Sequence, residues 1–223
     1  MTTPEQPHEP PASLRIAYVP GVTLTKWRRI WAERFPEDEL TIREVTEKDQ
    51  RAVLIEDVAD MCFIRLPIDR EDLHAIPLYE EQPVVWMSKD HLLAALDEVS
   101  PADLEDVTVL HDAEPGSIEL ATYCAAVLRV PMSIARSGSR RDLIYLPALE
   151  EPTTTVALAW RTDNANPLID EFIGVVRGRS VNSSRSQRER GEAVPRKAAG
   201  RQERPARAPQ RRRARNPRGR GHR

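Results

Sequence analysis

Hydrophobic and polar residues follow two different periods between residues 14 and 176 of this 223-residue chain. Short apolar or alternating runs predict strands at 14–19, 40–45, 60–65, 73–78, 84–87, 107–110, 143–146 and 155–160. Apolar residues at helical spacing predict helices at 24–35, 49–55, 91–96, 116–128 and 167–173. Because strands alternate with helices, we expect an α/β fold built from βαβ units around a largely parallel sheet.

The pattern stops at both ends of the chain. Residues 1–13 are polar and rich in Pro, without the basic and apolar stretches of a secretory signal, so we expect a disordered leader. Residues 177–223 consist mostly of Arg, Pro, Gly, Ala and Ser and cannot bury enough apolar surface to offset ordering, which predicts a disordered tail. The sequence has no long apolar run that would span a membrane, and we expect a cytoplasmic location.

Charge is divided unevenly between these parts. Residues 177–223 contain 17 Lys and Arg and three acids, which leaves 16 basic and 32 acidic residues in 1–176. Flexible arginine-rich segments bind phosphates with little sequence preference. We therefore expect the tail to bind nucleic acid nonspecifically, through Arg211, Arg212, Arg213, Arg215, Arg218 and Arg220. Docking on an acidic protein surface, including this chain's own body, and a mere solubility extension are the alternatives.

Seven segments, in this order, are similar to the effector-binding domain of LysR-type transcription regulators: 14–23, 31–44, 58–65, 78–85, 91–93, 130–136 and 167–173. Examples are Val58-Ala59-Asp60-Met61-Cys62-Phe63-Ile64-Arg65, which resembles the family's third strand, and Val130-Pro131-Met132-Ser133-Ile134-Ala135-Arg136 in the second lobe. The resemblance implies a two-lobed, type II periplasmic-binding-protein-like fold, with lobe one at 14–82 and 151–176 and lobe two at 83–150. Two features depart from the pattern. No helix-turn-helix precedes the domain, and lobe two is truncated, since residues 110–116 lead almost directly into one helix.

This architecture gives a candidate ligand site in the cleft between the lobes. Open α/β sheets bind ligands at the carboxyl ends of strands, and helix N-termini favour anions. The loops 20–26 and 115–117 would contribute Thr23, Thr25 and Ser117, the last as an expected N-cap. Arg65, at the end of its strand, could pair with a carboxylate, and Ser133 follows a turn near the same cleft. We expect the ligand to be a small organic anion; ordinary caps, turns and a solvated Arg65 are the alternative.

Other chemistry finds little support in the sequence. The five histidines are scattered, no metalloprotease, nucleophile-elbow, phosphate-loop or dinucleotide motif is present, and we expect no enzyme, cofactor or metal site. We interpret His111-Asp112 with Glu114 as a solvated loop, and Cys62 and Cys124 as reduced core thiols. A homodimer follows from the resemblance alone. Three alternative functions remain: the solute-binding protein of a transporter, an enzyme on the same fold such as a dehydratase, and an RNA- or DNA-associated or protein-docking platform with a degenerate cleft.

Overall fold

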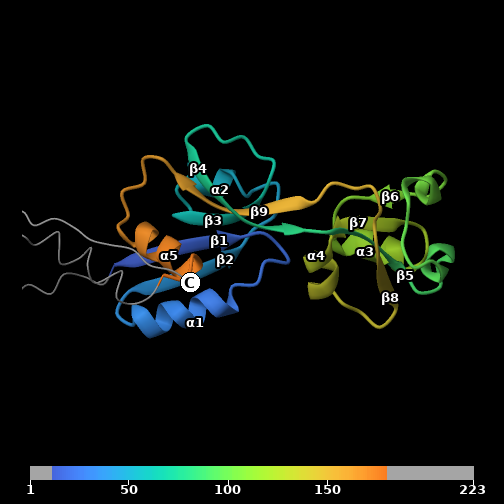
Figure 1. Cartoon of the computed structure of the whole chain (residues 1–223), viewed down its shortest axis with the longest axis horizontal. Coiled ribbons are helices and arrows are strands. Elements are labelled where there is room, and N and C mark those ends of the chain that lie inside the picture. The colour runs from blue at the N-terminus through green and yellow to red at the C-terminus, as the bar shows by residue number, and fades with distance from the viewer. Residues whose placement is uncertain (1–11, 180–223) are drawn as a thin grey trace, which may run out of the picture.

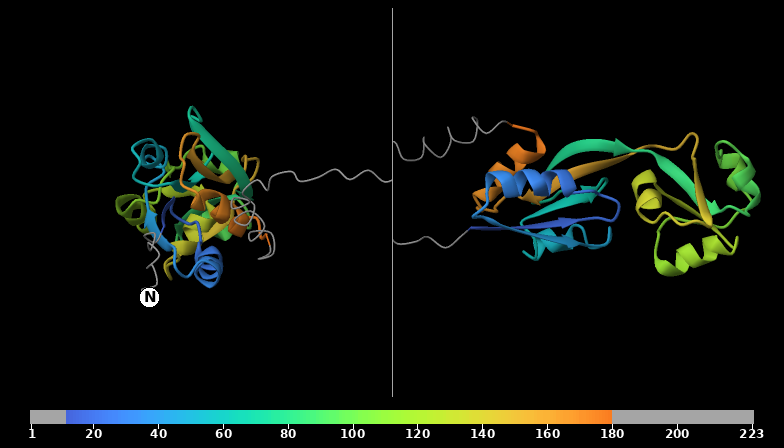
Figure 2. Two further views of the ribbon diagram at one scale, coloured as in Figure 1. Left: turned by 90° about the vertical axis from the view of Figure 1, so that its left-hand side faces the viewer. Right: turned by 90° about the horizontal axis from the view of Figure 1, so that it is seen from below.

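The computed structural model describes residues 12–179. The predicted leader and tail therefore lie outside the described residues, except for positions 12–13 and 177–179 at their inner ends. The described chain forms two lobes, one at each end of an elongated body, joined by two extended segments that run side by side (Figures 1 and 2). The two-lobed periplasmic-binding-protein-like fold predicted from the sequence is confirmed, with a separate sheet in each lobe.

Lobe one contains a five-stranded sheet in the order β2-β1-β3-β9-β4. Its strands are β1 (Ser13–Tyr18), β2 (Glu39–Glu44), β3 (Met61–Arg65), β4 (Leu73–Glu81) and β9 (Thr154–Arg161). Three helices pack on the sheet: α1 (Thr25–Arg34), α2 (Ala52–Ile55) and α5 (Leu168–Val176). In Figure 1, α1 and α5 lie together at one side of the sheet while α2 lies beside β3 and β4.

Lobe two contains a four-stranded sheet in the order β6-β7-β5-β8. Its strands are β5 (Pro83–Ser88), β6 (Val109–Leu110), β7 (Val127–Pro131) and β8 (Leu143–Pro147). Two α-helices and two short 3₁₀ helices complete it: α3 (Pro115–Thr122), α4 (Met132–Ser137), η1 (Leu92–Ala95) and η2 (Pro101–Leu104). Figure 1 shows α4 on the side of this lobe that faces lobe one.

The near-continuous apolar run of β3 is explained by cover on both faces of the lobe-one sheet. All five of its residues are buried. Met61 and Phe63 belong to the cluster beneath α1 and α5, whereas Cys62 and Ile64 belong to the cluster beneath α2. Phe63 stacks on the Trp27 ring at a centroid distance of 4.8 Å, so an aromatic layer ties α1 to the middle of the sheet. Burial of such side chains contributes roughly 1.5–3 kcal/mol each.

The expectation of a largely parallel sheet is wrong. Three strand pairings are parallel (β1–β2, β1–β3 and β6–β7), but four are antiparallel (β3–β9, β4–β9, β5–β7 and β5–β8). The reason is the connection between lobes. The chain leaves lobe one along β4 and returns from lobe two along β9, so β9 runs opposite to its neighbours β3 and β4.

The expected helix 116–128 is also wrong beyond its first half. Helix α3 ends at Thr122, Cys124 adopts a left-handed φ of 57°, and residues 127–131 form strand β7. A left-handed residue ends a helix because the next N–H can no longer follow the helical path. Cys124 is consequently exposed, so the expectation of a core thiol holds for Cys62 and fails for Cys124.

The next segment corrects a second local expectation. The turn expected before Ser133 is instead the end of β7 followed directly by the first turn of α4. Pro131 stands at the N-cap position of α4, and the helix runs from Met132 to Ser137. Ser133 is therefore delivered by a helix N-terminal turn that starts directly from a buried strand, which fixes its position in lobe two.

Candidate ligand site between the lobes

Arg65 is the centre of the junction between the two lobes. Its guanidinium donates from Nε to Glu81 Oε2 at 2.7 Å and from Nη1 to Glu47 Oε1 at 2.7 Å. Nη2 donates to the carbonyl oxygen of Pro20 at 2.7 Å and to the hydroxyl of Ser133 at 3.2 Å. Ser133 belongs to lobe two, whereas the other three partners come from lobe one. One side chain thus joins three loops or strand ends of lobe one to the second lobe.

The backbone of Arg65 is held as firmly as its side chain. Its N–H donates to Gln50 Oε1 at 2.8 Å, and Gln50 Nε2 donates back to the Arg65 carbonyl at 3.2 Å. Both residues are buried. This reciprocal pair fixes the end of β3, so the guanidinium has little freedom to leave its partners.

The carboxylates around Arg65 differ in their access to solvent. The side chain of Glu81 is 4% exposed and that of Arg65 is 3% exposed, whereas that of Glu47 is 45% exposed. Within the described residues, Glu81 Oε1 is buried without a hydrogen-bond partner. The Arg65–Glu81 pair is a buried ion pair, which is strongly destabilised when one partner is removed. The Glu47 contact is at the solvent side of the guanidinium.

Gly21 brings the loop after β1 against the start of α4. It has a φ of +86°, and a Cβ at this position would lie 2.6 Å from Ser133 Oγ and 2.9 Å from the Ile134 nitrogen. Only glycine accepts both this conformation and this approach at low cost. The Pro20-Gly21 breaker in the sequence therefore marks a close contact between the lobes.

A second contact between the lobes is made at the surface. Lys48 Nζ lies 3.3 Å from Glu114 Oε1, and both side chains are well exposed. Next to it, the hydroxyl of Ser117 donates to Asp112 Oδ1 at 2.5 Å and the Glu114 N–H donates to the same oxygen, and these bonds lower the pKa of that carboxyl. Ser117 lies inside α3, whose N-cap position is taken by Glu114, so the expected N-cap role of Ser117 is wrong.

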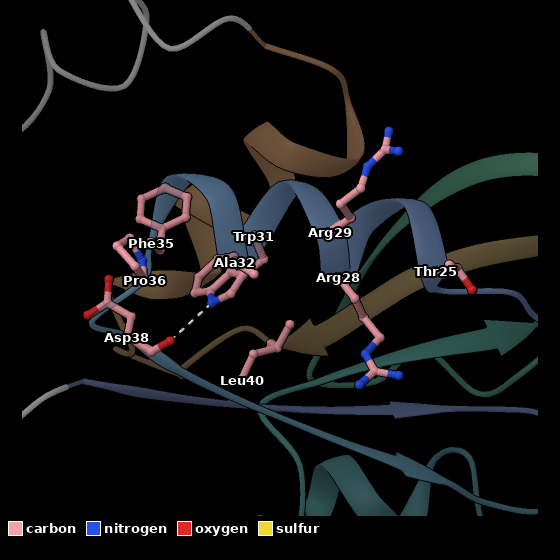
Figure 3. A pocket seen from close by; sticks show the side chains of 9 residues that line it. All are labelled: Thr25, Arg28, Arg29, Trp31, Ala32, Phe35, Pro36, Asp38 and Leu40. Atoms are coloured by element: carbon pink, nitrogen blue, oxygen red, sulfur yellow. Dashed lines mark hydrogen bonds between the residues drawn. The ribbon is translucent and has the colours of Figure 1, made fainter.

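Among the hydrogen bonds of residues 12–179, none joins Arg65 to either threonine predicted for the cleft. Thr23 is exposed in the loop after β1. Thr25 begins α1 and lines a cavity of about 520 Å³ between α1 and the start of β2, with Arg28, Trp31 and Leu40 among its neighbours (Figure 3). In Figure 3 the Arg28 and Arg29 side chains extend to opposite sides of α1. The Trp31 indole donates to the Asp38 carbonyl at 3.2 Å.

A second, smaller cavity of about 200 Å³ lies in lobe one between strands β1 and β2 and the segment around Val53 and Val58. Its rim includes Arg15, whose guanidinium is already bound by Asp57 and Asp60. Both cavities are in lobe one, and neither includes Arg65 or Ser133.

The structure thus joins two of the predicted residues, Arg65 and Ser133, by a hydrogen bond. The loop 20–26 expected at the cleft does reach the junction, at Pro20 and Gly21. Sequence reasoning missed Glu47 and Gln50 as partners of Arg65. Glu81 lies at the end of β4, next to the connection to lobe two, and it is buried.

The family model of the LysR substrate binding domain matches residues 7–129, more than half of the chain. This chain belongs to that family. LysR substrate binding domains are the effector-binding parts of transcription regulators. No curated protein matches the sequence.

Solved structures of LysR-type regulators share the fold. A variant of the OxyR regulatory domain from Pseudomonas aeruginosa is 23% identical, with a TM-score of 0.61, covering 76% of this chain and 98% of that chain. The effector binding domain of a BenM variant has a TM-score of 0.64 at 20% identity, covering 74% and 93%. Full-length CbnR complexed with its target DNA has a TM-score of 0.61 at 14% identity, covering 74% and 70%.

Residues 12–179 contain neither a metal-ion cluster nor a membrane-spanning helix. There, no group of three or more His, Cys, Asp or Glu side chains is arranged to hold a metal ion. In the same part of the chain, no helix has the length and apolarity needed to cross a membrane.

Proposed function

We propose that this LysR-type domain senses a small organic anion at the junction between its lobes. The observation that carries the proposal is the Arg65 cluster, in which one guanidinium bonds to lobe one and to Ser133 of lobe two. A group that competes for this guanidinium acts on both lobes at once. Ligands that bind between lobes convert binding energy into lobe movement in this way.

An anion would enter by replacing Glu47. Arg65 already uses its donors on four acceptors, so a ligand carboxylate gains the guanidinium only in exchange for an existing partner. Glu81 is buried and hard to displace, whereas Glu47 is half exposed and can turn into solvent. A carboxylate with two oxygens matches the fork of the guanidinium and retains the charge balance that Glu47 provides.

Thermal denaturation of the full chain with a panel of mono- and dicarboxylic acids, including benzoate and succinate, tests this function. An acid present at 100-fold excess over its Kd is expected to stabilise the domain by about 2.7 kcal/mol. Amines of matched size serve as controls for ionic effects. A flat response to the whole panel would favour a degenerate junction that serves as a docking platform.

We also propose that residues 180–223, outside the described part of the chain, bind nucleic acid nonspecifically. The support is their composition, in which arginines outnumber acidic residues. These arginines include Arg211, Arg213, Arg218 and Arg220. Truncation after Ser180 is expected to abolish retention on duplex DNA and structured RNA, and the full chain should show a steep loss of affinity with salt. Undiminished binding by the truncated chain would refute this role and would mean that residues 1–180 bind the nucleic acid.

A homodimer is a further expectation, drawn from the family. It concerns the assembled regulator rather than the ligand site. Light scattering coupled to size-exclusion chromatography of the full chain decides it, since a dimer has twice the mass of 25.3 kDa.

A further inference from the structure

The lobes are tied beside their chain connections, by the Met132 N–H to the Gln82 carbonyl at 2.9 Å and by Arg129 to Glu151 at 2.6 Å, and also across the junction around Arg65. The covalent connections are the step from β4 to β5 at Gln82 and the segment 148–153 between β8 and β9. Two extended connections of this kind allow one lobe to turn against the other, as in hinged two-domain proteins. What holds the relative position of the lobes must therefore be sought in non-covalent contacts near the hinge.

Three contacts cross the junction away from the connecting segments, and they differ in how exposed they are to solvent. The Lys48–Glu114 pair is exposed on both sides, and pairs of this kind contribute little. The hydrogen bond from Arg65 Nη2 to Ser133 Oγ starts from a guanidinium that is 3% exposed. Beside it, Gly21 touches the same residue, with no space for a Cβ. The half-buried contacts at Ser133 are therefore better shielded from solvent than the exposed Lys48–Glu114 pair.

The position of Arg65 is set entirely from lobe one. Glu81, Glu47 and the Pro20 carbonyl fix three sides of the guanidinium, and Gln50 fixes its backbone. The remaining direction points across the junction to Ser133, in the first turn of α4. Lobe one thus positions the charged donor, the Arg65 guanidinium. Lobe two supplies the neutral acceptor, the Ser133 hydroxyl, from a helix that follows β7 directly.

From this geometry we propose that Arg65 is a latch between the lobes, closed by its hydrogen bond to Ser133. Loss of that bond frees lobe two to turn about Gln82 and residues 148–153. The proposal rests on the proposed function, because it concerns how the same junction is opened to a ligand. Glu81, immediately before the hinge, couples the latch to the point of rotation.

The latch can be tested by measuring the distance between spin labels on the two lobes in the full chain. Cys124 is exposed in lobe two, Cys62 is buried, and Glu33→Cys supplies a label on α1, where the side chain is 66% exposed. Ser133→Ala in this labelled parent removes only the acceptor. The distance distribution is expected to broaden and shift to longer values relative to the parent.

Two glycine variants calibrate this measurement. Gly21→Ala inserts a Cβ against Ser133 and the Ile134 nitrogen and wedges the lobes apart, which supplies the open reference. Gly116→Ala, where a Cβ would meet nothing within 4 Å, is the matched control and should superimpose on the parent. A Ser133→Ala distribution that superimposes on the parent overturns the latch. This measurement uses no ligand, so its failure is separate from that of the thermal screen with organic acids.

Discussion

Arg65 and Ser133 lie 68 residues apart in the sequence, and Nη2 of the first donates to Oγ of the second at 3.2 Å across the junction of the lobes. The guanidinium that makes this contact is neutralised from the other side by Glu81 and Glu47. A residue expected to receive a ligand is therefore already engaged by the chain itself. Under the proposed function, a ligand anion would bind by exchanging its carboxylate for one of these.

The buried ion pair of Arg65 is expected to carry a large share of the stability of the junction. Arg65→Ala leaves Glu81 buried without its cation and should lower the free energy of unfolding by about 3–5 kcal/mol. Arg140→Ala is the matched control, since its pair with Asp142 is exposed and contributes at most about 1 kcal/mol. Urea denaturation followed by Trp fluorescence measures both, and equal midpoints for the two variants would refute the buried role.

Stability should also fall in acid because of Asp60. Burial of this carboxyl opposes its ionisation, but hydrogen bonds from the Arg15 side chain and backbone N–H outweigh burial and lower the pKa of Asp60. A carboxyl with a lowered pKa in the folded state contributes stability above its unfolded pKa of about 3.9. That contribution is lost as the pH falls through the lower, folded value.

Asp60→Asn therefore has a pH-dependent cost. At neutral pH it should reduce the free energy of unfolding by about 1.5–3 kcal/mol, the usual contribution of hydrogen bonds to a charged group. Near pH 3 the difference in the free energy of unfolding between Asp60→Asn and the unsubstituted protein should become smaller. Urea midpoints at the two pH values measure it, with Asp97→Asn at an exposed position of lobe two as the control. A gap that stays constant with pH would contradict the role of Arg15.

The two thiols should react at very different rates. Burial raises the pKa of Cys62 to about 12, and its side chain is inaccessible, whereas Cys124 is exposed. Only the thiolate is nucleophilic. Titration with Ellman's reagent is expected to find one thiol per folded chain and two in urea. Cys124→Ser should leave none reactive in the folded state; rapid reaction of that variant would mean that β3 opens readily.

The sequence predicted the fold well because its strongest signals are local. Runs such as residues 61–64 and the helical spacing of residues 27–35 report burial directly, and both elements are found. The helix expected at 116–128 failed because apolar spacing continued past the point where Cys124 turns the chain with a left-handed φ. A run of residues with β-branched Val127 and Val130 then pairs with β5 as a strand.

The site was harder to predict, since its contacts are long-range. Arg65 meets Pro20 and Ser133 at separations of 45 and 68 residues, and no periodicity encodes such meetings. The end of a buried strand indicated that Arg65 was in a functional place, but not that Glu81 would be its partner. The family resemblance supplied the two lobes, whereas the side-chain contacts depend on how distant segments pack together.

The central claim, that an anion replaces Glu47 on Arg65, is tested most directly by calorimetric titration of Glu47→Gln. The probe is whichever acid of the panel stabilises the full chain most. Removal of the competing carboxylate should tighten binding several-fold relative to the unsubstituted protein. Glu98→Gln, with the same change of charge at an exposed position of lobe two, should leave the Kd unchanged. Equal affinity of Glu47→Gln and Glu98→Gln for the acid would contradict the replacement of Glu47 by the anion.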